Sequence, residues 1–117
     1  MHPLATRQCR PLTDQSDRLS IDAVNKFLAD LEGWTLDEEG PALQRRFKFK
    51  NFPQTMLFVN AVAWLAQQQD HHPDVQFGYN QCQIRYTTHS VGGVSENDLI
   101  CAARINTLFD NKTSEQG

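Results

Sequence analysis

The chain has 117 residues, 39% of them hydrophobic and 21% charged, which predicts one globular domain that folds around its own core. A formal net charge of -3 argues against nucleic-acid binding, and no apolar run is long enough to span a membrane. Three widely spaced cysteines, Cys9, Cys82 and Cys101, are typical of reduced thiols, so we expect a cytoplasmic protein.

The first helix is expected to begin after Ser20, a suitable N-cap, and to end at Gly33. Between them the apolar residues recur at helical spacing, at Ile21, Val24, Leu28 and Leu31. A short strand over residues 34–36 and a turn over residues 37–41 are expected to follow.

Residues 43–50 alternate apolar and polar side chains, which predicts a strand with one face in water. We assign the basic residues of this stretch to the wet face, with an oligonucleotide site as the lesser alternative; they are Arg45, Arg46, Lys48 and Lys50. Asn51 can cap a second helix that runs to about Gln69. Pro73 then disfavours helical geometry at His72.

Two further strands are expected to form a hairpin with a turn at residues 80–81. Their apolar residues alternate, at Val75, Phe77 and Tyr79 in the first strand and at Cys82, Ile84 and Tyr86 in the second. Ser95 with Asp98 makes a capping-box-like start for a last helix. The order α-β-β-α-β-β-α predicts an α+β fold, with one antiparallel sheet and its helices packed on one face.

This domain is expected to cover residues 19–110. Residues 1–18 are polar, interrupted by prolines and without a period, which predicts a flexible or loosely docked N-terminal tail. Residues 111–117 are expected to form a flexible C-terminal tail.

Three histidines are candidates for chemistry. His71 and His72 end the second predicted helix, and His89 follows the fourth predicted strand. Histidine titrates near neutral pH, so the group indicates acid–base catalysis, recognition of a polar heterocycle, or a metal site, with solvated helix-end histidines as the structural alternative. Adjacent histidines at a helix end diverge, and no histidine pair has the i, i+4 spacing that chelates, so we expect no metal.

The spacing around these histidines resembles that of the pterin-4a-carbinolamine dehydratase family, also called the dimerization cofactor of a hepatocyte nuclear factor. His71-His72-Pro73 is followed after five residues by Tyr79, after nine more by His89, and after another eight by Asp98. The resemblance extends over roughly Ser20 to Phe109 and includes three shorter matches, at Gly33-Trp34, at residues 47–52 and at Gly93-Val94-Ser95.

The resemblance implies a four-stranded antiparallel sheet with three helices, in a chain that assembles as a homodimer or homotetramer. It implies the dehydration of 4a-hydroxytetrahydrobiopterin to quinonoid dihydropterin without a cofactor, a step that recycles the cofactor of aromatic amino-acid hydroxylases. Two alternatives stay open. The chain could be an interaction module for a hydroxylase or a transcription factor, or it could act on another pterin, as in molybdenum-cofactor metabolism.

By this resemblance, His71 and His72 are the acid–base candidates, and His89 orients or stabilises the carbinolamine. The backbone around Thr87, Thr88 and His89 is expected to help hold the pterin ring.

The other matching residues are expected in supporting roles. Pro73 ends the helix and aims the histidine pair, and Tyr79 is expected to pack as an aromatic residue of the strand core, with a stacking platform as the alternative. Asp98 needs no role beyond capping, because it lies three residues after Ser95. Trp34 either lines the pterin pocket or packs in the core.

One position departs from the family. Gln67 stands four residues before His71, where the family usually has an ionisable side chain. Residues i and i+4 share a helix face, so a carboxylate there would raise the pKa of His71, whereas an amide can only hydrogen-bond. We therefore expect a weaker enzyme or a shifted pH optimum, with Asp70 and Asp74 as candidates to compensate.

Overall fold

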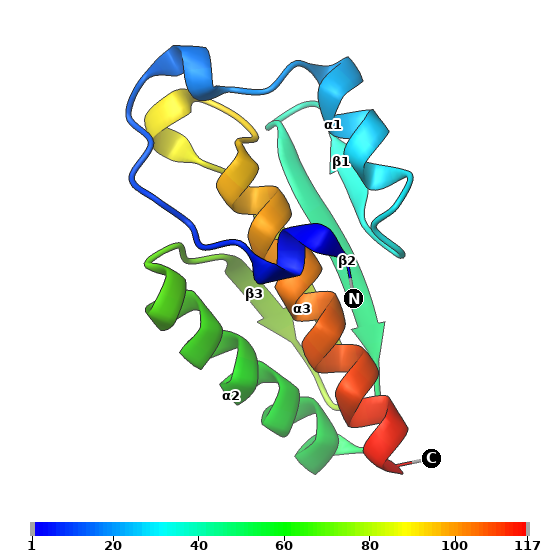
Figure 1. Cartoon of the computed structure of the whole chain (residues 1–117). Helices are drawn as coiled ribbons and strands as arrows, with labels where there is room; N and C mark the ends of the chain where they lie inside the picture. The colour runs from blue at the N-terminus through cyan, green and yellow to red at the C-terminus, as the bar shows by residue number, and fades with distance from the viewer. Residues whose placement is uncertain (1, 117) are drawn as a thin grey trace.

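The computed structural model describes residues 2–116, and the side chains of residues 2–110 (Figure 1). Its helices and strands follow the predicted order: α1 (Ile21–Leu28), β1 (Thr35–Asp37), β2 (Ala42–Lys48), α2 (Phe52–Gln69), β3 (Asp74–Phe77), β4 (Gln81–Tyr86) and α3 (Glu96–Gln116). Short 3-10 turns are η1 (Pro3–Thr6), η2 (Gln15–Asp17) and η3 (His89–Val91). No helix within the described range combines the length and apolarity that crossing a bilayer requires.

The four strands form one antiparallel sheet in the order β1-β2-β4-β3. Successive side chains of a strand point to opposite faces of the sheet. On one face the side chains of β2 and β4 are buried, with Leu43 opposite Tyr86 and Phe47 opposite Cys82. All three helices contribute to the core on that face, through residues such as Val24, Phe58 and Leu99. Helices α2 and α3 run across the sheet in Figure 1. The predicted α+β fold is confirmed.

Two side chains differ from the prediction in their burial: one that was expected in water packs on the core, and one that was expected in the core is exposed. Arg45 pairs with Ile84 on the helix-covered face, where its guanidinium carbon lies 4.4 Å above the Phe47 ring, so its assignment to the wet face was wrong. The alternation in β2 starts from Leu43, and Arg45 is two residues on. Tyr79 is 65% exposed in the turn after β3, so its assignment to the strand core was also wrong.

The end of α2 fixes the direction of the histidine pair. Asn51 caps the start of the helix by accepting a hydrogen bond from the Gln54 N–H, as predicted. At the other end Asp70 takes the left-handed conformation, with φ of 51°, and the chain leaves the helix there. His71 therefore no longer follows the helical rise, and Pro73 disfavours helical geometry at His72, so that the chain passes without helix into β3.

The N-terminal segment, expected to be flexible or loosely docked, packs on the domain through a few buried side chains. Leu4 and Ala5 of η1 belong to the hydrophobic core, and Leu12 is buried as well. Figure 1 shows this segment crossing in front of α3. At the other end, α3 continues to Gln116. The predicted C-terminal tail, residues 111–117, lies outside the residues whose side chains are described.

Candidate active site

His71 is held between the core and the surface. Its side chain is 13% exposed, and its ring stacks on Tyr86 with the two ring centroids 5.1 Å apart. The Tyr86 hydroxyl donates to the His71 carbonyl at 3.1 Å, and the His71 N–H donates to the Ala66 carbonyl at 3.1 Å. These contacts fix both the backbone and the ring of this histidine.

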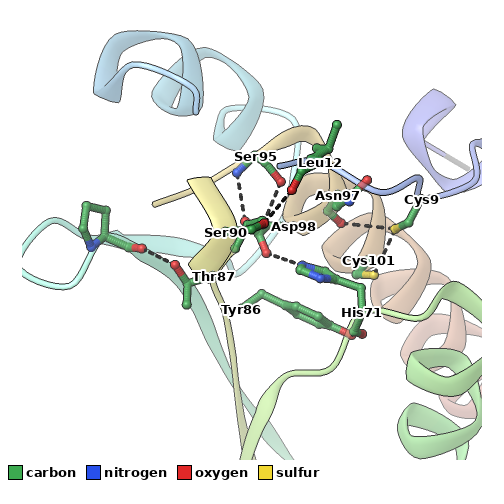
Figure 2. Close-up of polar contacts among 12 residues, drawn as sticks. Cys9, Leu12, His71, Tyr86, Thr87, Ser90, Ser95, Asn97, Asp98 and Cys101 are labelled. Atoms are coloured by element: carbon green, nitrogen blue, oxygen red, sulfur yellow. Dashed lines mark hydrogen bonds and ion pairs between the residues drawn. The ribbon is translucent and has the colours of Figure 1, made fainter. Parts of the chain in front are cut away.

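His71 pairs with Asp98, which the sequence predicted only as a helix cap. The distance from His71 Nε2 to Asp98 Oδ1 is 2.6 Å, and Asp98 is fully buried (Figure 2). Asp98 Oδ2 accepts hydrogen bonds from the Ser95 N–H at 2.9 Å and from the Thr88 hydroxyl at 2.8 Å. The capping role is therefore confirmed, and the same carboxylate also orients the imidazole.

This set of donors assigns the His71 tautomer. A carboxylate only accepts, so the nitrogen that faces Asp98, Nε2, carries a proton. The Thr88 hydroxyl donates its one hydrogen bond to Asp98. The Ser95 hydroxyl, whose oxygen lies 2.7 Å from that of Thr88, must therefore donate to Thr88. The remaining nitrogen of His71, Nδ1, is the one that can exchange a proton with a ligand.

The surroundings of His71 favour its protonated form. Burial by itself lowers the pKa of His71, but the hydrogen bond and negative charge of Asp98, with smaller contributions from Cys9 and Asp70, outweigh it. The net result is a pKa raised above the ordinary value of 6.5. The ordinary pKa of histidine lies close to neutral pH, so the side chain is suited to both donating and accepting a proton in one reaction cycle.

A cavity of about 250 Å³ lies beside His71. Its walls come from three parts of the chain: residues 9–13, residues 69–71 at the end of α2, and the group Thr88, Ser90 and Asn97. This volume lies just below the range of about 300–1,000 Å³ that is common for sites of drug-sized ligands. The cavity is thus suited to a small ring system with polar edges.

Cys9 forms part of this cavity and was missed as a site residue. Its Sγ lies 3.6 Å from the Sγ of Cys101 on α3, and both thiols are free. The hydrogen bond with Cys101 lowers the pKa of Cys9, while the same bond, together with burial, raises that of Cys101. No sequence signal could have placed Cys9 here, because it lies in a segment without periodicity.

The other two candidate histidines, His72 and His89, do not line this cavity. His72 is exposed, and His89 is exposed on η3. The structure thus brings His71 and Asp98 together, while His72 and His89 lie outside the cavity wall.

Gln67 contacts the second histidine of the pair. Its Oε1 lies 3.5 Å from Nε2 of His72, whereas His71 pairs with Asp98. The prediction that Gln67 reaches His71 was wrong, because the chain leaves the helix at Asp70. The negative charge beside His71 comes mainly from Asp98, with smaller contributions from Cys9 and Asp70.

The residues expected to hold the pterin have other partners. The Thr87 hydroxyl donates to the Pro41 carbonyl at 2.8 Å. Thr88 lines the cavity, but its backbone N–H and carbonyl are both bonded to Gly93. Trp34 is 4% exposed and donates to Asn106 Oδ1 at 2.8 Å, which places it in the core.

Among the described residues, no three side chains of histidine, cysteine, aspartate or glutamate are arranged to hold a metal ion.

Comparison with known proteins places the histidine site in a family context. Residues 17–108 match a family model described as pterin 4 alpha carbinolamine dehydratase. The chain is 51% identical over 106 residues to a protein of Nitrosospira multiformis and 50% identical over 107 residues to one of Nitrosomonas eutropha. The alignments cover 91% of this chain and 92% and 93% of these relatives, both provisionally named pterin-4-alpha-carbinolamine dehydratases.

Two solved structures resemble the fold. A transcriptional coactivator/pterin dehydratase from Brucella melitensis aligns with a TM-score of 0.75 and 35% identity, over 78% of this chain and 97% of that one. A pterin dehydratase-like protein described as a RuBisCO assembly factor in the alpha-carboxysome aligns with a TM-score of 0.58 and 29% identity, over 66% of this chain and 89% of that one.

Proposed function

This chain belongs to the pterin-4a-carbinolamine dehydratase family, and on that premise we propose that it removes water from 4a-hydroxytetrahydrobiopterin to give quinonoid dihydropterin. The observation that carries the proposal is the pairing of His71 with the buried Asp98 beside a cavity of suitable size. His71 is the principal acid–base residue in this proposal.

The reaction needs one proton donated and one removed. The protonated His71 donates through Nδ1 to the C4a hydroxyl as the C4a–O bond breaks, and the N5 lone pair forms the C4a=N5 bond. The N5 proton then passes to the neutral imidazole, which restores the starting state as water leaves. Asp98 keeps the imidazole in one orientation and stabilises its charged form.

His72 and His89 are kept as the second acid–base candidate and the carbinolamine-orienting residue. Both are exposed, so their side chains can change rotamer when a substrate binds. Asp70, which lines the cavity, is a candidate to accept hydrogen bonds from the edge of the pterin ring.

The direct test is the rate of dehydration with purified protein. We expect the protein to accelerate the conversion of 4a-hydroxytetrahydrobiopterin by about 10²–10⁴-fold over the spontaneous reaction, the range that positioned acid–base groups supply. Stopped-flow absorbance at several enzyme concentrations measures it. A rate equal to the spontaneous one would contradict the proposal.

The finer role is the recycling of the pterin cofactor of an aromatic amino-acid hydroxylase. It is tested by adding the protein to a hydroxylase reaction whose rate is limited by regeneration of the pterin cofactor.

A second candidate function, an interaction module, is favoured by the alignment with a coactivator and with an assembly factor. Co-purification with a partner, combined with an absence of dehydration, would select it.

We also expect self-association through the outer face of α2. Leu57 and Trp64, two helical turns apart, are 57% and 71% exposed and leave an apolar stripe without a cover in the single chain. Replacing Trp64 by lysine should convert the homodimer or homotetramer to a smaller species in sedimentation velocity. The matched control is Phe27→Lys on α1, which should not change the oligomer. An oligomer that survives Trp64→Lys would place the interface elsewhere.

A further inference from the structure

We propose that residues 9–13, here called the strap, form the wall of the substrate cavity that positions the pterin against His71, and that Asn97 is the positioning residue that holds this wall. The inference rests on the proposed function of the His71 site. The strap lies outside residues 17–108, the part of the chain that matches the family model.

The strap supplies a large share of the cavity surface. Five of the eleven residues that line the cavity belong to it, and the others come from the end of α2, the η3 region and the start of α3. His71 is on the wall formed by the end of α2. Without the strap, the site beside His71 would be an open surface from which a small ligand is easily lost.

Three side chains of the other walls hold the strap by its backbone. Asn97 accepts from the Arg10 N–H at 3.2 Å and donates to the Arg10 carbonyl at 2.7 Å, so that both backbone polar groups of Arg10 are fixed. Gln69 accepts from the Cys9 N–H at 2.8 Å, and the Ser90 hydroxyl donates to the Leu12 carbonyl at 2.5 Å. Figure 2 shows Asn97, Ser90 and Leu12 around the His71–Asp98 pair.

The burial of these side chains shows that the strap is an integral part of the wall. Asn97 and Gln69 are only 6% and 8% exposed, and each has its amide group satisfied by the strap or by Gln8 beside it. A buried amide that loses its partner costs free energy, so the docked strap is the favoured state. Asn97 also directly precedes Asp98, so the residue that holds the wall and the residue that orients His71 are neighbours at the start of α3.

The test compares two matched asparagine variants of α3. Asn97→Ser removes the pair of bonds to Arg10, while Asn106→Ser removes bonds to Glu32, Trp34 and Arg45, away from the cavity. We expect Asn97→Ser to raise KM about five- to twentyfold, to change kcat less than about threefold, and to leave the pH profile in place. Asn106→Ser should leave KM within about twofold of wild type.

Two further readouts do not depend on turnover. Cys9 is the only cysteine of the strap and is half-buried, so release of the strap should speed its alkylation by iodoacetamide about tenfold, measured by peptide mass spectrometry. Binding of 7,8-dihydrobiopterin, measured by calorimetry, should weaken about five- to twentyfold in Asn97→Ser. If Asn97→Ser folds poorly, Ser90→Ala, which removes only the bond to Leu12, should change both readouts in the same direction.

The outcomes separate the two proposals. Faster alkylation of Cys9 with unchanged dihydrobiopterin affinity would overturn the strap as a wall of the site and leave the dehydratase proposal standing. Unchanged alkylation in both variants would overturn the role of Asn97 in holding the strap. A wild type that dehydrates nothing yet binds dihydrobiopterin through the strap would overturn only the proposed reaction. A wild type that does neither would overturn both.

Discussion

Replacement of His71 by glutamine is expected to lower kcat for dehydration by about 10²–10⁴-fold, the contribution of a positioned acid–base group. Glutamine keeps an N–H that can donate to Asp98, so the buried carboxylate retains a partner and the fold survives. What disappears is the titrating nitrogen, Nδ1. Single-turnover rates measured by stopped flow separate this loss from changes in substrate binding.

The control for this variant is Lys48→Gln, on the strand face that the helices leave uncovered. Its kcat should equal that of wild type. His72→Gln and His89→Gln complete the series, and we expect both to lower kcat by less than His71→Gln does. A His71→Gln protein with a kcat within tenfold of wild type would remove His71 from the proton transfer.

The ionisation of His71 should also make the free energy of unfolding depend on pH. Because the pKa of His71 is raised in the folded protein, protonation stabilises the fold. This stabilisation is complete below about pH 6.5, the unfolded-state value, and is lost as the pH rises through the raised folded-state value. Chemical denaturation of wild type and His71→Gln across this window should therefore show a difference that diminishes with rising pH.

The fold could be predicted from local patterns because each element has its own. Helical spacing after Ser20, alternation in the strands, and the caps at Asn51 and Ser95 all act over a few residues. Arg45 was misplaced because a long side chain can lie on an apolar face while its charged end reaches polar partners, here the Glu32 carbonyl and Asn106. Local patterns do not distinguish this arrangement from a solvated arginine.

The site could be predicted only in part, because its contacts join residues far apart in sequence. The family spacing singled out both His71 and Asp98, but their 2.6 Å contact spans 27 positions and depends on the turn at Asp70. The same turn separated Gln67 from His71. The strap was missed for a different reason. Its hydrogen bonds to Asn97 and Gln69 use the backbone groups of the strap, which every residue has, so no pattern of side chains in the strap predicts them.

Asp98→Asn provides the sharpest test of the pairing. An amide oxygen can replace only one of the carboxylate oxygens, so at least one of the donors His71, Ser95 and Thr88 loses its acceptor, and a fold destabilised by about 1–3 kcal/mol is expected. Without the carboxylate, burial dominates and the pKa of His71 falls below its ordinary value. The alkaline limb of the kcat profile should then move to lower pH, and kcat at pH 7.5 should fall by about 10²-fold or more.

The matched control is Asp37→Asn, which breaks the half-exposed ion pair with Arg85 and should change stability by about 1 kcal/mol or less without moving the pH profile. If Asp98→Asn were destabilised but kept the wild-type kcat and pH profile, Asp98 would be only the cap of α3. If instead the alkaline limb moves while the His71 ring still stacks on Tyr86 in the variant's structure, the carboxylate acts by holding a proton on His71. In that case the raised pKa of His71 comes mainly from α3, because a buried carboxylate in direct contact with the imidazole acts more strongly than an exposed one a helical turn away.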